Sequence, residues 1–145
     1  MAYGEKLQVE GLQQINRQLA DIGGKDARKA MAAAHRVTAQ MVYDDAKHHI
    51  PVGSQKAGKG KGSKHPGRLQ KSLRVQAAAH RGSVVLGGKR VPYAPAIHWG
   101  WPKRHLRGRR VVWHALGKNQ GKIRLEFFKQ MDKVLSDYGL NRDNV

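Results

Sequence analysis

A long stretch without a single carboxylate is the strongest constraint in this sequence. Between Asp45 and Glu126 there is no Asp or Glu, and 19 of the chain's 28 Lys and Arg residues lie at these positions, 46–125. The rest of the chain is close to neutral, with nine basic and ten acidic residues, so the net charge of +18 arises in the middle. A surface that only has to be soluble mixes both signs of charge. We therefore expect a fold that presents its middle to an anionic partner, with nucleic acid as the first choice and an acidic protein surface as the second.

Length and composition limit the class of protein. The 145 residues, of which 39% are hydrophobic, predict one domain spanning 1–145 with a modest core. The absence of cysteine excludes disulfides, thiolate catalysis and Cys-based zinc sites, so stability must come from packing or from subunit association. No run of about eighteen apolar residues is present, and the first ten residues carry acids rather than an apolar signal segment. We expect a soluble protein made in the cytoplasm, without a membrane partner.

Residues 52–67 predict a long flexible basic loop. Glycine alternates with lysine here, which loosens the backbone and makes the segment repel itself, so it cannot fold alone. Lysine is a point charge that can follow a phosphate backbone without reading base edges. The GxxxxGK[ST] spacing of a phosphate-binding loop is missing, so we expect no nucleotide cofactor. The cations here that we assign to contact with DNA or an acidic partner are Lys56, Lys59, Lys61, Lys64 and Arg68.

Two helices are predicted before this loop. The first has apolar residues every three or four positions and ends at Gly23-Gly24. Its stripe consists of Leu12, Ile15, Leu19 and Ile22. The second runs from about Asp26, a suitable N-cap, to His49, and Pro51 stops it. We expect its apolar side to consist of Ala27, Ala30, Ala34, Val37 and Met41.

The segment after the loop predicts a small antiparallel sheet. Residues 69–77 alternate apolar and polar side chains, as a half-buried strand does, and residues 83–87 form a second strand. Residues 80–82 can make the tight connection of a hairpin, and Gly87-Gly88 breaks the chain after it. Residues 92–102 are short and rich in proline, which favours a brief edge strand over a helix.

A long helix from about Val112 to Gly139 closes the fold and is followed by a tail, residues 140–145. Its apolar stripe consists of Ile123, Phe127, Met131, Val134 and Tyr138, widened by Leu116, Phe128 and Leu135. The predicted class is α+β, with a small antiparallel sheet flanked by N-terminal helices and a long C-terminal helix. The expected core consists of Leu69, Leu73, Val75, Val84, Leu86, Ile97, Phe127 and Met131.

The residue pattern gives little support to catalysis. A two-metal nuclease would have to draw its carboxylates from different helices, at poor spacing. The cationic region holds seven histidines, namely His48, His49, His65, His80, His98, His105 and His114. They show no HxxxH or HExxH spacing, so a histidine-based nuclease is only the third hypothesis. We expect no catalytic residues, no metal site and no cofactor.

Aromatic and basic residues follow each other closely in positions 93–110. The aromatic rings could stack on bases, but their place among prolines and glycines favours a contact between subunits. We assign that contact to Tyr93, Ile97, Trp99 and Trp101. The basic residues that follow are assigned to DNA or to an acidic neighbour, and they are Lys103, Arg104, Arg107, Arg109 and Arg110.

Several short motifs occur in an order that resembles a known family. GRLQKSL at 67–73, PYAPAIHWG at 92–100 and VVWHAL at 111–116, which leads into the last helix, follow the proline that closes the second helix. Over about residues 7–138 the chain resembles the HK97 gp10-like family of tailed-phage proteins. That family shows G-x-L-x-x-S, then Y-A-x-x-[hydrophobic]-[E/H]-x-G, then an aromatic-x-x-A start to the final helix. This chain departs from it in the strongly basic insertion at 55–65 and in the last motif, where one residue instead of two separates Trp113 from Ala115.

The resemblance implies a structural subunit of the phage neck or tail-completion complex, at the head-to-tail junction. Such subunits form a homo-oligomeric ring, here expected to be six- or twelve-fold, around the channel through which DNA passes. The implied partners are the adjacent connector or stopper and tail-tube or terminator proteins, with non-specific contact to duplex DNA. The protein would be assembled in the host cytoplasm and reside in the virion. The residue pattern keeps two alternatives open, a free nucleic-acid-binding protein and a histidine-based nuclease or toxin.

Overall fold

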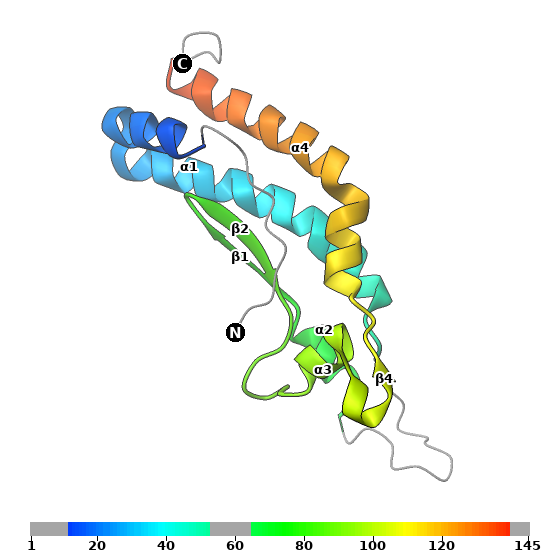
Figure 1. Ribbon diagram of the computed structural model, residues 1–145. Coiled ribbons are helices and arrows are strands. Elements are labelled where there is room, and N and C mark those ends of the chain that lie inside the picture. Colours follow the sequence, from blue (N-terminus) through cyan, green and yellow to red (C-terminus); the bar gives the residue numbers. More distant parts are fainter. Residues whose placement is uncertain (1–11, 53–64, 140–145) are drawn as a thin grey trace.

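The computed structural model describes residues 12–52 and 65–139 and has the predicted α+β architecture. Two long helices, α1 (Leu12–His49) and α4 (Val111–Asp137), pack together (Figure 1). A hairpin of β1 (Arg74–Ala78) and β2 (Arg81–Val85) packs against α1. The predicted tail, 140–145, and most of the predicted loop, 53–64, lie outside the described residues.

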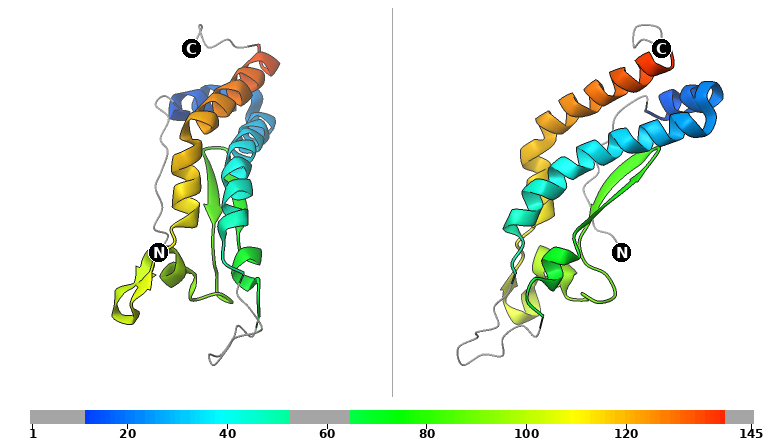
Figure 2. Two further views of the ribbon diagram at one scale, coloured as in Figure 1. Left: turned by 90° about the vertical axis from the view of Figure 1, so that its right-hand side faces the viewer. Right: turned by 180° about the vertical axis from the view of Figure 1, so that it is seen from behind.

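A glycine divides α1 into two helical segments. Gly24 has φ 54° and ψ −127°, a backbone conformation outside the helical region that favours glycine. The chain therefore changes direction there, which confirms the helix end predicted at Gly23-Gly24 (Figure 2). The second segment ends at His49, as predicted from Pro51.

The buried side of α1 differs from the predicted one. Of the five expected positions only Ala27 and Ala34 are buried, while Ala30 and Met41 are half-buried and Val37, at 39% exposed, is wrong. The buried positions are Ala27, Met31, Ala34, His35, Thr38, Ala39, Val42 and Ala46. This side is broad because α1 packs against both α4 and the β1–β2 hairpin. It tolerates Thr38 because the Thr38 hydroxyl donates a hydrogen bond of 3.0 Å to the His35 carbonyl.

The predicted strand over 69–77 begins too early. Residues Arg68–Lys71 form a short helix, α2, and the strand β1 starts only at Arg74. Leu69 and Leu73 are both 4% exposed, and their spacing of four places them on one side of the chain as it leaves α2. The second strand also differs from its prediction, because β2 covers 81–85 instead of 83–87 and the turn lies at 79–80 instead of 80–82. The antiparallel pairing is confirmed, with Val75 opposite Val84.

The segment 92–102, predicted as an edge strand, is mainly helical. Residues Ala94–Trp99 form α3, and only Gly100–Trp101 belong to a strand, β3. The prolines misled the prediction, because Pro95 lies in the first turn of α3, where a missing N–H costs nothing. At the other end, α4 starts one residue before the predicted Val112 and ends just before Gly139, which has φ 72°.

Two separate clusters of buried residues form the core. The first cluster consists of Val42, Ala46, Ile50, Leu69, Leu73, Val91, Ala94, Ala115 and Ile123. The second cluster consists of Ala27, Met31, Phe127, Met131, Val134 and Leu135. Of the eight predicted core residues, Leu69, Leu73, Phe127 and Met131 are buried, whereas Val75, Val84, Leu86 and Ile97 are half-buried. Among the described residues, no helix is both long and apolar enough to span a membrane.

His35 makes the stability of the fold depend on pH. It is 7% exposed, its ring lies 5.2 Å from that of Phe127, and its Nε2 atom has no hydrogen-bond partner. Burial lowers the pKa of His35 below 6.5, and nearby His80 lowers it further, while a hydrogen bond with the Ala79 backbone opposes the shift. The folded protein therefore holds His35 neutral, and the unfolded chain takes up its proton first.

The free energy of unfolding should therefore carry no penalty from His35 above about pH 6.5. It should decrease as the pH drops from there toward the lowered pKa of His35 in the folded state. The loss is at most about 1.4 kcal/mol per pH unit for this histidine. Urea unfolding of His35→Gln between pH 7.5 and 5 should show a flatter dependence than the parent protein. His48→Gln, an exposed position on the same helix, serves as the control. An unchanged slope in His35→Gln would contradict the assignment.

Candidate anion-binding hairpin and groove

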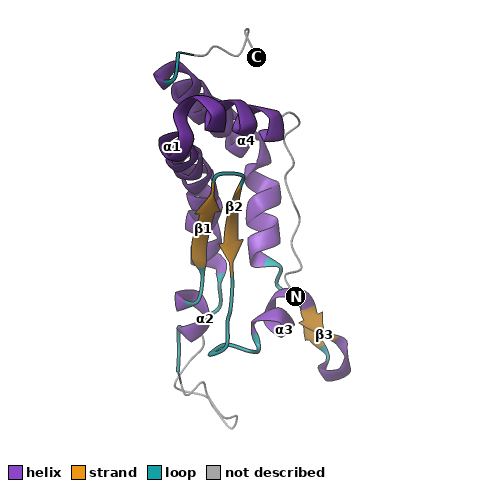
Figure 3. Cartoon of the chain, turned by 90° about the vertical axis from the view of Figure 1, so that its left-hand side faces the viewer, coloured by secondary structure: helices purple, strands orange, loops and turns teal. Residues whose placement is uncertain are grey.

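A second, smaller hairpin and the chain that follows it carry five of the six described cations that the sequence assigns to binding. The hairpin consists of β3 (Gly100–Trp101), a 3-10 turn η1 (Pro102–Arg104) and β4 (Leu106–Arg107). The strands are antiparallel, with Gly100 opposite Arg107 and Trp101 opposite Leu106. The β3–β4 hairpin lies at the opposite end of the molecule from the C-terminal end of α4 (Figures 1 and 3).

Backbone contacts fix this hairpin to α3. The Arg109 N–H donates to the Ile97 carbonyl at 3.0 Å, and the Arg110 N–H donates to the His98 carbonyl at 2.7 Å. These bonds satisfy carbonyls near the C-terminal end of α3 that the helix itself leaves free. Gly108 lies so close to the Trp99 backbone that any side chain there would collide with it. The backbone of Arg109 and Arg110 is therefore held in place against α3.

Five basic residues gather on the hairpin and on the chain that returns from it to α4. These hairpin cations are Lys103, Arg104, Arg107, Arg109 and Arg110, and all five are exposed. Arg68, also assigned to binding, lies at the start of α2 and is half-buried. The other four assigned lysines, Lys56, Lys59, Lys61 and Lys64, lie outside the described residues. The second group of predicted cations is thus exposed on the hairpin and on the segment between the hairpin and α4.

The residues assigned to subunit contact divide into two kinds. Tyr93 is 42% exposed and Trp101 is 44% exposed, so both are accessible to a partner. Ile97 and Trp99 are half-buried, and Ile97 packs against the first cluster. The Arg104 guanidinium lies 5.0 Å from the Trp101 ring centroid, a cation–π arrangement that holds the arginine over an aromatic face. Trp101 also lies opposite Leu106, which is 44% exposed, so the hairpin carries an exposed apolar pair beside its cations.

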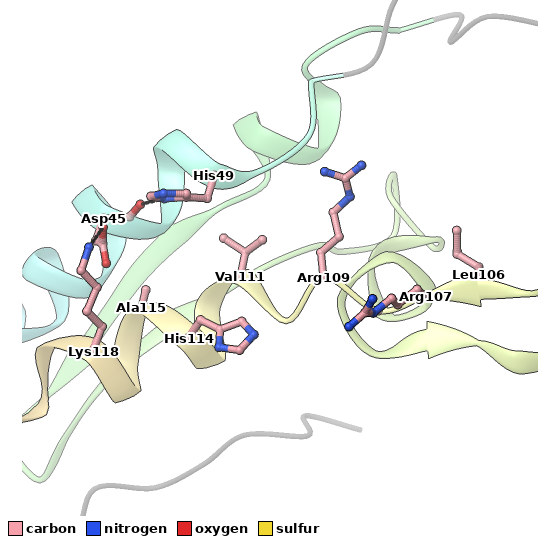
Figure 4. Close-up of a pocket in the computed structure, with 10 residues that line it drawn as sticks. Asp45, His49, Leu106, Arg107, Arg109, Val111, His114, Ala115 and Lys118 are labelled. Atoms are coloured by element: carbon pink, nitrogen blue, oxygen red, sulfur yellow. Dashed lines mark hydrogen bonds and ion pairs between the residues drawn. The ribbon is translucent and has the colours of Figure 1, made fainter.

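A groove of about 740 Å³ opens between the β3–β4 hairpin, the end of α1 and the first turns of α4 (Figure 4). It is lined by Asp45 and His49 of α1, by Leu106, Arg107, Gly108 and Arg109, and by Val111, His114, Ala115 and Lys118. Sequence reasoning missed this groove, because its residues come from three segments that only the tertiary fold brings together. No periodicity or motif in the sequence signals the groove.

The charge of the groove is positive. Its lining holds one carboxylate, that of Asp45, which lies 3.7 Å from Lys118 Nζ and accepts a hydrogen bond of 2.9 Å from Asn119. The side chain of Lys118 reaches from α4 toward Asp45 on α1 (Figure 4). The Asp45 carboxylate therefore already interacts with Lys118 and Asn119. Arg107 and Arg109 are exposed, and the groove lining holds no further carboxylate to pair with them.

His98, in α3, lies beside Arg110 and His114. Burial lowers its pKa, and the charges of Arg110 and His114 lower it further, so the imidazole stays neutral near pH 7. Its Nε2 atom is buried without a hydrogen-bond partner, and its ring packs against Trp99 with centroids 4.5 Å apart. Within residues 12–52 and 65–139, no three His, Asp or Glu side chains lie close enough to hold a metal ion together.

Comparison with known proteins adds no relative. No family model matches the chain, and no curated protein or solved structure matches it either.

Proposed function

We propose that this protein is a non-enzymatic structural subunit that contacts duplex DNA without reading its sequence, as part of a ring at a bacteriophage head-to-tail junction. The observation that carries the DNA contact is the gathering of five exposed cations on the β3–β4 hairpin, within a stretch of 80 positions that has no carboxylate. The motif order described above supports the place of the subunit in the neck or tail-completion complex.

The chemistry of the hairpin suits a sliding contact. Charge contacts to phosphates are independent of sequence and individually weak, so a duplex held by several of them can still move. The hairpin also joins cations to an exposed apolar pair, Trp101 and Leu106, which is typical of a surface that binds a protein neighbour as well. A ring subunit needs both contacts, one with the genome and one with the next subunit.

The test combines DNA binding with oligomeric state. Purified protein should bind a random-sequence duplex weakly at physiological salt, with log affinity falling linearly against log salt, and should associate only weakly by itself. Rings should close when the neighbouring head or tail proteins are added, as electron microscopy can show. A purified monomer that binds DNA tightly at physiological salt, and forms no ring with any neck or tail protein, would overturn the ring role and favour a free nucleic-acid-binding protein.

The same purified protein can be tested for nuclease activity. Incubation with DNA and RNA, with and without a divalent metal ion, should leave both nucleic acids intact. Cleavage that His98→Ala or His114→Ala abolishes would replace the structural role by a nuclease.

A further inference from the structure

The groove beside the β3–β4 hairpin differs from the outer hairpin surface in shape. It is an open concave space with a volume of about 740 Å³, bordered by α1, α4 and the hairpin (Figure 4). Duplex DNA is too wide to enter a groove of this size, whereas a protruding element such as the tip of the hairpin can reach its phosphates or enter one of its grooves. A concave groove of this size suits a narrower ligand, such as a single extended peptide segment.

The lining of the groove selects the chemistry of that ligand. Arg107 and Arg109 contribute two exposed guanidinium groups, and each can bind a carboxylate with two parallel hydrogen bonds. His49 and His114 line the same space and are exposed. The one carboxylate in the lining, Asp45, is matched by Lys118 and Asn119. The free charge of the groove is therefore complementary to an acidic ligand.

Apolar side chains accompany these cations. Val111 is half-buried, Ala115 is 4% exposed and Leu106 is 44% exposed, and all three line the groove. A bare phosphate backbone would gain nothing from these side chains, whereas a peptide can place an aliphatic side chain against them. The combination favours a peptide that carries both acids and aliphatic residues.

We propose that this groove binds an extended acidic segment of a partner protein, with carboxylates at Arg107 and Arg109 and an aliphatic side chain against Val111 and Leu106. The inference rests on the proposed function and deepens it, because it divides the cationic end of the molecule between two ligands. The outer hairpin cations, Lys103 and Arg104, face DNA, and the groove receives a neighbouring protein.

The experiment uses three labelled peptides and one duplex DNA with the full-length protein. The probes are short peptides built from Asp-Glu-Leu repeats, Asp-Glu-Ser repeats and Lys-Lys-Leu repeats, and binding is followed by fluorescence anisotropy. Two double variants carry the same change of charge. One is Arg107→Glu with Arg109→Glu, which changes the groove, and the other is Lys103→Glu with Arg104→Glu, which changes hairpin residues that do not line it.

The Asp-Glu-Leu peptide should bind the parent protein more tightly than the other two peptides. The groove variant should lose roughly tenfold or more in affinity for it, on the scale of two lost charge-assisted contacts. The matched variant should lose much less. Leu106→Ser, at an exposed position, should reduce the preference for Asp-Glu-Leu over Asp-Glu-Ser, and thermal unfolding of each variant checks that it is folded.

Equal losses in the two double variants would overturn the proposal, since a diffuse charge effect would then explain binding. Displacement of the bound peptide by duplex DNA at equal charge concentration would also overturn it, because the groove would then belong to the DNA surface. A different result would show that the proposed function is wrong while the groove proposal is right. In that case the groove variant would lose affinity for the peptide, and neither double variant would change the affinity for DNA.

Discussion

Replacing the two outer hairpin cations, Lys103 and Arg104, by glutamine is expected to weaken binding of the protein to duplex DNA by roughly tenfold or more at low salt. The variant keeps Arg107 and Arg109, which line the groove, and Arg110, whose left-handed backbone (φ 47°) begins α4. Each phosphate contact that is lost removes about 0.9 from the slope of log affinity against log salt. The slope should therefore become shallower by about two, which a titration at several salt concentrations measures directly.

A variant with the same loss of charge at other positions provides the control for this result. It replaces Lys25 and Arg28, which are exposed residues of α1 outside the hairpin and groove. Each variant lowers the net charge by two, so a general attraction between a cationic protein and DNA would weaken equally in both. Equal losses of affinity and of slope would show that the hairpin has no special role.

Leu135→Ala is expected to destabilise the protein by about 3–5 kcal/mol, the range typical of a large-to-small change at a fully buried leucine. Leu135 is 1% exposed and belongs to the second cluster, where it shares the space between α1 and α4 with Met31 and Phe127. Removing its side chain leaves a cavity that the two helices cannot easily close. Urea unfolding at pH 7.5 measures the loss.

Leu125→Ala on the same helix gives the matched comparison. Leu125 is 74% exposed, so its replacement should change the free energy of unfolding by no more than about 0.5 kcal/mol. A small effect at Leu135, or a similar effect at both positions, would show that the second cluster is not closely packed.

Much of this fold could be predicted from local signals. The end of the first helical segment at Gly24, the stop after His49 and the β1–β2 hairpin all depend on residues close together in the sequence. The errors arose where tertiary packing or position within an element decides the outcome. Proline at the start of a helix and proline in an edge strand look alike in sequence, so α3 was predicted as a strand. Val37 was expected on the apolar side of the second helix, because hydropathy does not say which face of α1 the other elements cover.

The candidate site could be predicted only in part, for a related reason. Its charge is a property of composition, and the cations from Lys103 to Arg110 lie close together in any compact conformation of eight residues. The groove is a property of the tertiary structure, because Asp45 and Lys118 meet only when the end of α1 lies beside the start of α4. No periodicity or motif in the sequence contains that information.

The division of the core into two clusters has a consequence for how such a protein can evolve. The β3–β4 hairpin and the groove adjoin the first cluster, while the second cluster holds α1 and α4 together with a different set of side chains. Substitutions in the hairpin and the groove therefore leave the packing at the other end intact. A lineage can change the charge and shape of this surface by mutation, while selection on the distant helical half preserves the scaffold.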